Sequence, residues 1–185
     1  MDHFREEVVT KRNRTVESVL YALSFVVMIV SGLITVFMFN LLTMAISTQG
    51  FSSGMIMDIV FTVLMAATAV LLFLYKDRIK TEYEYTFTNG TMDFARVFNN
   101  KKRKSLGTMN IKNIEACGKV SSGSFHRYLS MPGVRRLNWF LNRDAELFYF
   151  YFVKDSAKSL MIIEPSDEMV QLIIRYAGQG KYQQN

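Results

Sequence analysis

Residues 19–46 read VLYALSFVVMIVSGLITVFMFNLLTMAI, and no charged side chain occurs between Glu17 and Asp58. A core helix of a soluble protein rarely exceeds about 14 uninterrupted apolar residues, whereas a membrane-spanning helix needs about 20. The run therefore predicts a transmembrane helix over residues 18–46. At 1.5 Å per residue such a helix is about 43 Å long, longer than a hydrocarbon core of about 30 Å, so it has to tilt or extend beyond the core.

A second apolar run covers residues 55–75 and predicts a second transmembrane helix. The uncharged segment 47–54, STQGFSSG, is typical of a short turn between the two helices. A cleavable signal peptide is the competing interpretation of the first run. Its apolar core would have about 7–15 residues, roughly half of what is present, so we favour a retained membrane hairpin.

Cations flank the outer ends of this hairpin and are absent from its inner turn; they are Lys11, Arg12, Arg14, Lys76, Arg78 and Lys80. The positive-inside rule then places both chain termini in the cytoplasm. We expect a multi-pass protein of the cell membrane, with residues 1–17 as a cytoplasmic segment and 47–54 as an extracytoplasmic turn.

Asn40 and Asp58 are the only strongly polar side chains in or beside the two runs. An ionisable group inside a membrane is a candidate functional residue. Asp58, however, lies only four positions after Gly54, and an interfacial carboxylate that starts the second helix is the favoured interpretation. Small residues at Thr62, Ala66 and Ala69 would allow close packing against another helix.

Residues 80–178 predict an α+β domain on the cytoplasmic side. The alternating residues 82–88 and 91–98 flank Asn89-Gly90, the strongest short signal of a β-hairpin. Further strands are expected over the ranges 105–111, 114–119, 146–153 and 159–164. The range 146–153, ELFYFYFV, is apolar on both faces, which favours a central strand.

One amphipathic helix follows these strands. Ser166 is placed to cap it, Asp167 and Glu168 complement its dipole, and Gly178 is placed to end it. The predicted architecture is a bent antiparallel sheet or open barrel with one C-terminal helix and a flexible tail over 179–185. Segment 120–143 gives no clear prediction of secondary structure.

Basic residues dominate this half of the chain: residues 76–185 contain 18 Lys and Arg against 11 Asp and Glu, about +7. Such a domain beside a bilayer is attracted to anionic lipid, by about 1 kcal/mol per cation near the surface. Two segments supply candidate contacts to anionic lipid or to a protein partner: Lys101, Lys102, Arg103 and Lys104 in a polar turn, and Arg127, Arg135, Arg136 and Trp139 in the irregular segment. A solvated turn and a loop folded over the sheet are the alternatives.

The sequence contains no recognisable catalytic constellation, and we expect a non-enzymatic protein without cofactor or metal. Two histidines and Cys117, the single cysteine, cannot form a closed zinc site unaided, and no phosphate-binding glycine pattern occurs. Cys117 with His126 is the one conceivable nucleophile–base pair, but a lone cysteine is more often a small buried residue. No nucleic-acid-binding motif accompanies the basic charge, which excludes the second common reason for it.

The order of an antiparallel meander followed by one amphipathic helix resembles a bacterial pleckstrin-homology-like (PH-like) domain. Nearly the whole chain also resembles a family of small, uncharacterised two-span membrane proteins of Gram-positive anaerobes. The residues that carry this resemblance are Met1–Glu6 with Lys11-Arg12, Glu82–Gly90, Lys101–Lys104, Phe125-His126 and Ile162–Pro165. Asp93 alone stands where that family usually has several acidic residues, and the resemblance implies no activity.

Two functions agree with these observations. The first is a membrane-anchored interaction module whose basic domain contacts anionic headgroups or a protein partner at the cytoplasmic face. The second is an accessory subunit of a transporter or cell-envelope complex, in which the hairpin packs against other membrane helices or a second copy of the chain.

Overall fold

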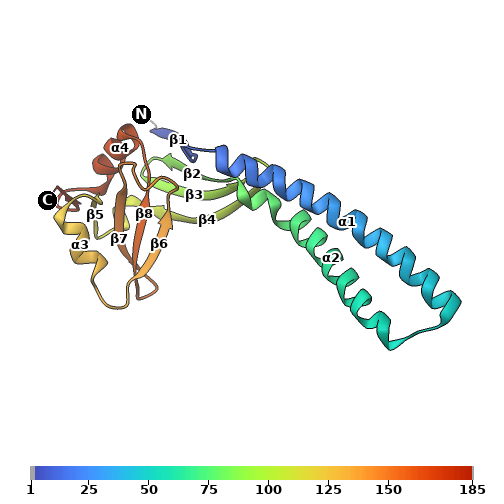
Figure 1. Ribbon diagram of the computed structural model, residues 1–185. Helices are drawn as coiled ribbons and strands as arrows, with labels where there is room; N and C mark the ends of the chain where they lie inside the picture. Colours follow the sequence, from blue (N-terminus) through green and yellow to red (C-terminus); the bar gives the residue numbers. More distant parts are fainter. Residues whose placement is uncertain (1–2, 185) are drawn as a thin grey trace. The chain divides into compact units, whose positions relative to one another are not determined.

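The computed structural model describes residues 3–184, which fall into two compact units (Figure 1). The helical unit comprises Asn13–Lys80. The sheet unit combines the described residues up to Arg12 with those from Thr81 onward. The helical unit is therefore inserted into the sequence of the sheet unit.

The helical unit consists of two antiparallel helices, α1 (Thr15–Gln49) and α2 (Ile56–Tyr75), joined by the short η1 (Ser53–Met55). The turn η2 (Lys76–Ile79) follows α2. Both long helices are apolar enough to cross a membrane, and only 11 % and 6 % of their most apolar stretches are buried. Core helices of a soluble protein are mostly buried, so this exposure favours an apolar environment around the unit.

The first sheet has the order β1-β2-β3-β4 and is antiparallel throughout. Its strands are β1 (Phe4–Val9), β2 (Thr81–Thr88), β3 (Thr91–Phe98) and β4 (Lys102–Asn110). The predicted turn between β2 and β3 is present, with φ values of 49° at Asn89 and 90° at Gly90, which suit the Asn-Gly pair.

Strand β1 is the main departure from the predicted domain plan. Residues 1–17 were expected to form a separate segment, yet β1 pairs with β2 from Phe4↔Thr88 to Val9↔Tyr83. In β1 only Val9 is buried, and the inward positions Arg5 and Glu7 are polar because they border a groove. This polar inner face hides the apolar alternation that normally marks a strand.

The second sheet has the order β6-β8-β7-β5-β9. It contains β5 (Ala116–Lys119), β6 (Arg135–Trp139), β7 (Phe148–Lys154), β8 (Ala157–Ile163) and β9 (Tyr182–Gln183), with β6 and β9 parallel to their neighbours. The short η3 (Ile111–Asn113) and α3 (Gly123–Leu129) lie beside β5 in sequence. Helix α4 (Asp167–Ala177) begins with Ser166 accepting a hydrogen bond from the Met169 N–H, as predicted.

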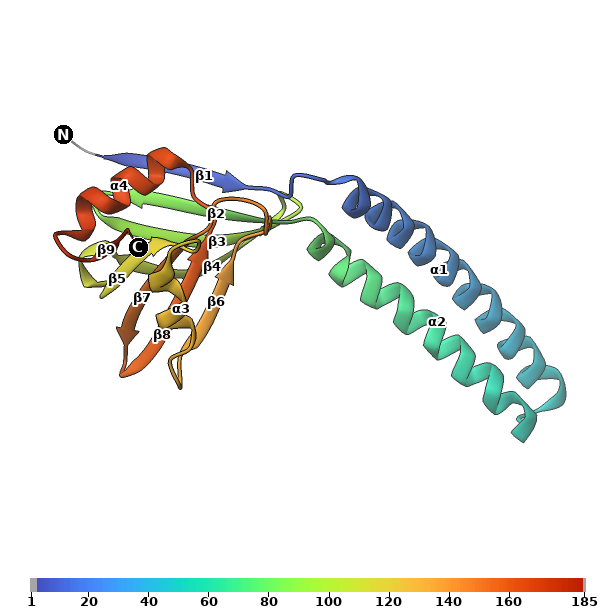
Figure 2. The ribbon, with the colours of Figure 1, turned by 60° about the vertical axis from the view of Figure 1, so that its left-hand side comes forward.

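Strand β7 is central in this sheet, as its two apolar faces predicted, and it separates two cores (Figure 2). Phe148 and Phe150 contribute to the core shared with the first sheet and α4. Tyr149 and Tyr151 contribute to the core under α3. The sheet unit is thus layered as first sheet, main core, second sheet, second core and α3.

In three segments the structure adds to the sequence prediction or departs from it. The range 120–143, for which no secondary structure was predicted, contains α3 and β6. The tail 179–185, expected to be flexible, contains β9, and its last residue, 185, lies outside the described residues. The polar turn expected over 99–104 is shorter, because Asn99 and Asn100 take positive φ and Lys102 already begins β4. Left-handed conformations are tolerated best by glycine and asparagine, so these two asparagines close the turn early.

We predict that Gly90→Ala destabilises the sheet unit by about 2–4 kcal/mol. A Cβ at Gly90, which has φ +90°, would lie 2.6 Å from Tyr176 Cδ1, so backbone strain and overpacking add. Gly133→Ala is the control, because Gly133 has φ +73° but open space around its Cβ position, and about 1–2 kcal/mol is expected. Denaturant unfolding in mild detergent, followed by the fluorescence of Trp139, the single tryptophan, measures both; equal losses would contradict the clash.

Candidate functional site

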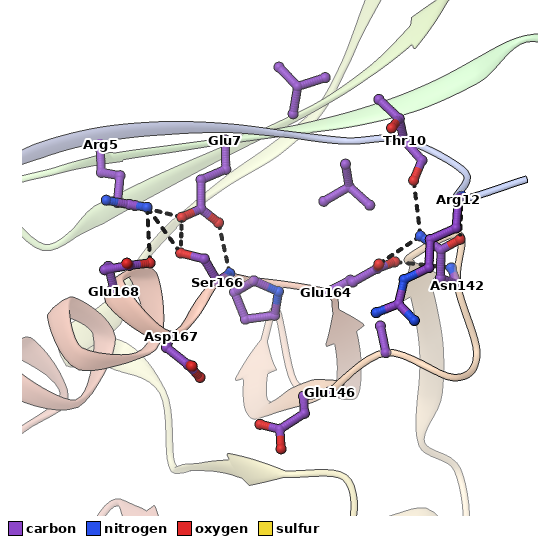
Figure 3. Close-up of a pocket in the computed structure, with 14 residues that line it drawn as sticks. Arg5, Glu7, Thr10, Arg12, Asn142, Glu146, Glu164, Ser166, Asp167 and Glu168 are labelled. Atoms are coloured by element: carbon purple, nitrogen blue, oxygen red, sulfur yellow. Dashed lines mark hydrogen bonds and ion pairs between the residues drawn. The ribbon is translucent and has the colours of Figure 1, made fainter.

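An open groove of about 720 Å³ lies between β1, the loop before β7 and the start of α4 (Figure 3). It is lined by Arg5, Glu7, Val8, Val9, Thr10, Arg12, Asn142, Ala145, Glu146, Glu164, Pro165, Ser166, Asp167 and Glu168. Five of these side chains are acidic and two are basic. All of them belong to the sheet unit, and β1 supplies one wall.

The first polar cluster in the groove joins β1 to the start of α4 (Figure 3). The Glu7 carboxylate accepts hydrogen bonds from the Ser166 backbone N–H at 2.9 Å and from the Ser166 hydroxyl. Arg5 donates to Glu7 at 2.5 Å and to Glu168 at 3.2 Å. The backbone N–H of Glu168 and the Ser166 hydroxyl, and then Arg5, hold the pKa of Glu168 below its usual value. Charge and helix capping therefore fasten β1 to α4.

The second polar cluster joins the end of β1 to the end of β8. Asn142 donates through its side chain to Glu164 Oε1 at 2.7 Å and to the Thr10 carbonyl at 2.9 Å. The side-chain oxygen Oδ1 of Asn142 accepts a hydrogen bond from the Arg12 backbone N–H at 2.9 Å. Glu164 Oε2 accepts from the Leu141 and Asn142 backbone N–H groups. Asn142 is 7 % exposed, so these bonds are shielded from water.

The two polar clusters of the groove together form a structural clamp, in which internal hydrogen bonds hold β1 in place. Glu7 and Glu164 are already engaged by internal donors, which leaves neither as a poised base. Among residues 3–184, no three His, Cys, Asp or Glu side chains gather in a way that could hold a metal ion. These contacts fix β1, the strand that enters the helical unit, at two points: the start of α4 and the end of β8.

The structure separates the basic residues that the sequence singled out in the turn. Lys101 lies in the β3–β4 turn, and Lys102, Arg103 and Lys104 lie on β4, all with exposed side chains. Arg103 forms an ion pair with Glu84 at 2.5 Å. Among the described residues, Lys102 and Lys104 have no ion-pair partner, so these two remain available for an anionic ligand.

In the second candidate group the three arginines are exposed, whereas Trp139 is buried. Arg127 lies on α3 and donates to the Tyr128 hydroxyl at 2.7 Å, while Arg136 on β6 donates to the Leu129 carbonyl at 3.2 Å. Arg135 is exposed on β6. Trp139 is buried, with its ring 5.1 Å from that of Phe94, which contradicts its assignment as a surface contact. The Trp139 ring packs in the main core instead.

Asn40 and Asp58 take part in local helical hydrogen bonding. The Asn40 side chain donates to the Val36 carbonyl at 2.8 Å. Asp58 lies in the first turn of α2, and its backbone carbonyl accepts from Thr62. The favoured interpretation of Asp58, a carboxylate that starts the helix, agrees with this position.

Cys117 is fully buried in the main core, and burial raises the pKa of its thiol to about 12, partly offset by Lys181. A thiol with that pKa is protonated at neutral pH and is a poor nucleophile. His126 lies on α3, exposed, at the other face of the sheet. This geometry opposes the Cys117–His126 pair as a reactive dyad.

Sequence reasoning identified Ser166 as a helix cap but found neither its partner Glu7 nor the second cluster, in which Asn142 bonds to Glu164. Those three residues come from segments far apart in the chain, and no local spacing links them. The one available signal was the pair of acidic residues at Glu6 and Glu7 directly before Val8 and Val9, which is compatible with a half-exposed edge strand.

We predict that Asn142→Ala destabilises the sheet unit by about 1–3 kcal/mol, because the Thr10 carbonyl, the Arg12 N–H and one Glu164 oxygen lose their partner. Asn138→Ala is the matched control, since the Asn138 side chain is exposed. Denaturant unfolding, followed by Trp139 fluorescence, measures the free energy of unfolding of both variants. A loss in the free energy of unfolding no larger than that of the control would show that Asn142 does not hold β1 in place.

We also predict that Cys117 resists thiol reagents in the folded chain at pH 8 and reacts readily once the chain is denatured. Burial and the raised pKa both suppress the thiolate, so the rate in the folded chain should not rise through the usual thiol range of about pH 8–9. Labelling followed by mass spectrometry measures it, and because Cys117 is the single cysteine no other site interferes. A folded-state rate equal to that of the denatured chain would contradict the burial.

Residues 1–182 match the model of a family described as Bacterial PH-like domain (DUF6106). The match extends over β1, both apolar helices and the sheet unit, and it confirms the predicted PH-like domain. No curated protein and no solved structure matches the chain. Since the family model covers nearly the entire sequence, the chain belongs to the family of bacterial PH-like domains of unknown function.

Proposed function

We propose that the protein is a non-enzymatic, membrane-anchored interaction module whose basic sheet end contacts anionic lipid headgroups on the cytoplasmic side. The observation that carries this proposal is the register of the first sheet. The β3–β4 turn lies at the same end of that sheet as the residues through which the chain leaves and re-enters it, Arg12 and Thr81.

The register of the first sheet sets the distance between the basic turn and Thr81, where the chain re-enters the sheet. Thr81 pairs with Phe98, and Phe98 pairs with Lys102, so Lys102 is two strand spacings, about 10 Å, from Thr81. If α2 spans a bilayer and ends at Tyr75, Thr81 follows only a few residues after the hydrocarbon core. The short link from Tyr75 to Thr81 limits how far the basic turn can lie from the headgroups, which supports a contact with anionic lipid.

The pairing of β1 with β2 also supports the proposed topology. Both strands belong to one sheet, so the helical unit has to leave and return on the same side of a membrane. The flanking cations of α1 and α2 support a cytoplasmic position for that side. The strand register thus supports a common side for both ends of the helical unit, and the charge pattern supports which side it is.

Binding to anionic vesicles tests this function. In the variant for this experiment, a short glycine-serine linker replaces residues 13–80, which keeps β1 beside β2. It should co-sediment with vesicles of phosphatidylcholine mixed with phosphatidylglycerol, but not with phosphatidylcholine alone, and less at high salt. Replacing Lys101, Lys102 and Lys104 with Gln should weaken binding by about 100-fold, from about 1 kcal/mol per cation.

The control replaces Lys112, Lys154 and Lys158 with Gln, three exposed lysines that lie away from the β3–β4 turn. Trp139 fluorescence verifies that each variant is folded. Equal losses in the two triple variants would contradict a specific basic end. Absence of binding to either kind of vesicle would favour the alternative function, an accessory subunit that assembles through the exposed apolar surfaces of α1 and α2.

A further inference from the structure

The outer edge of β5 is covered by a short segment of the same chain. After α4 ends, the chain reverses through Gly178 and Gly180, with φ values of 84° and 80°, and forms β9 beside β5 (Figure 2). The Cys117 N–H donates to the Lys181 carbonyl at 2.9 Å. Without β9, β5 would be an edge strand with unpaired backbone groups.

The β5 edge is shaped to receive a second backbone at close range. A Cβ at Gly118 would lie 2.7 Å from the Gln183 carbonyl oxygen, a distance that real side chains do not tolerate. The absence of a side chain at Gly118 therefore makes room for the neighbouring strand. Gly118 and Cys117 are buried in the sheet, so this receiving edge is part of the rigid core.

Two side chains of the covering segment show what the edge recognises. The ring of Tyr182 stacks on Phe148, with centroids 6.4 Å apart and planes 9° apart. Lys181 Nζ donates to the Lys112 carbonyl at 2.6 Å. A basic residue followed by an aromatic one thus fits the edge of β5. Backbone pairing with β5 supplies the remaining contact.

The covering segment itself is held weakly. Strand β9 has two residues, and the side chains of Lys181, Tyr182 and Gln183 are only half-buried. The Gln183 side chain bonds to the Gly180 carbonyl within its own turn rather than to the sheet. Short terminal strands with few buried contacts open locally at a small fraction of the free energy of global unfolding.

We propose that the β5 edge is a strand-docking site for an extended peptide of a partner protein, which displaces residues 181–183. The partner segment carries a basic residue followed by an aromatic one and pairs in parallel with β5. Strand addition of this kind takes affinity from the backbone and specificity from side-chain pockets. The site lies in the second sheet, so it does not depend on the proposed lipid contact of the first.

A peptide in trans tests the proposal, with the chain held in mild detergent. A fluorescent peptide with the sequence of residues 178–185, GQGKYQQN, should bind a variant that lacks residues 179–185. It should bind the intact chain at least about tenfold more weakly, because the covalent segment competes at a high effective concentration. The same peptide with Tyr182→Ala should lose about 2-fold to 10-fold in affinity, the range for one aromatic pair.

Two further measurements make the outcome decisive. Adding Gly118→Ala to the shortened variant should abolish peptide binding, because its Cβ would lie 2.7 Å from the position of the Gln183 carbonyl oxygen, and Trp139 fluorescence verifies that the variant is folded. In the intact chain, the Cys117 amide should exchange with deuterium faster than the Phe150 amide of central β7, because local opening frees it. This second measurement needs no truncation, so it stands even if the shortened variant unfolds.

Three results would overturn the proposal. One is a folded shortened variant that ignores the peptide. Another is a Cys117 amide that exchanges only as slowly as Phe150, since the segment would then be a fixed strand. A third is a dimer of the intact chain with exchanged C-terminal segments, seen by light scattering, which would assign the edge to a second copy of the chain.

Discussion

The pairing of β1 with β2 is the contact on which the rest of the molecule depends. These strands are adjacent in the sheet but separated in sequence by the whole helical unit, Asn13–Lys80. Six residue pairs hold them together, and the groove clamp adds Ser166 at the start of α4 and Asn142 in the loop before β7 as anchors. Closing so long a loop is entropically costly, which explains why β1 needs support from beyond its own ladder.

This arrangement gives each end of the first sheet a distinct character. One end, where Val9, Thr81 and the β3–β4 turn meet, carries the chain into and out of the helical unit and is basic. The opposite end, at the β2–β3 turn, packs Gly90 against Tyr176 of α4. The second sheet shares the main core with the first, and its short edge strand β9 covers β5. One small unit thereby presents two separate surfaces.

The sequence predicted those elements whose signals are local. The two apolar helices, the Asn89-Gly90 hairpin, the central position of β7 and the Ser166 cap each depend on neighbouring residues, and the structure contains all of them. Strands β1, β6 and β9 were missed because tertiary contacts form them. Arg135 and Arg136 obscured β6, and β9 is too short to show any period.

The candidate site was harder to predict than the fold for the same reason. Glu7 lies more than a hundred residues before Asn142 and Ser166 in the sequence. Only the folded sheet unit brings these residues to one groove. Trp139 was misassigned because an aromatic residue among bases resembles an interfacial anchor, whereas its position on β6 turns it toward Phe94. The exposure of Lys102 and Lys104 was predictable, because lysines in a polar segment are almost never fully buried.

The insertion of the helical unit between two paired strands also sets an order on biosynthesis. A ribosome adding about 5–20 residues per second needs roughly 4–14 s to pass from the end of β1 at Val9 to the start of β2 at Thr81. During that interval β1 has been made but its partner strand does not exist. The first sheet can be completed only after both apolar helices have been synthesised, so their synthesis precedes folding of the domain that flanks them.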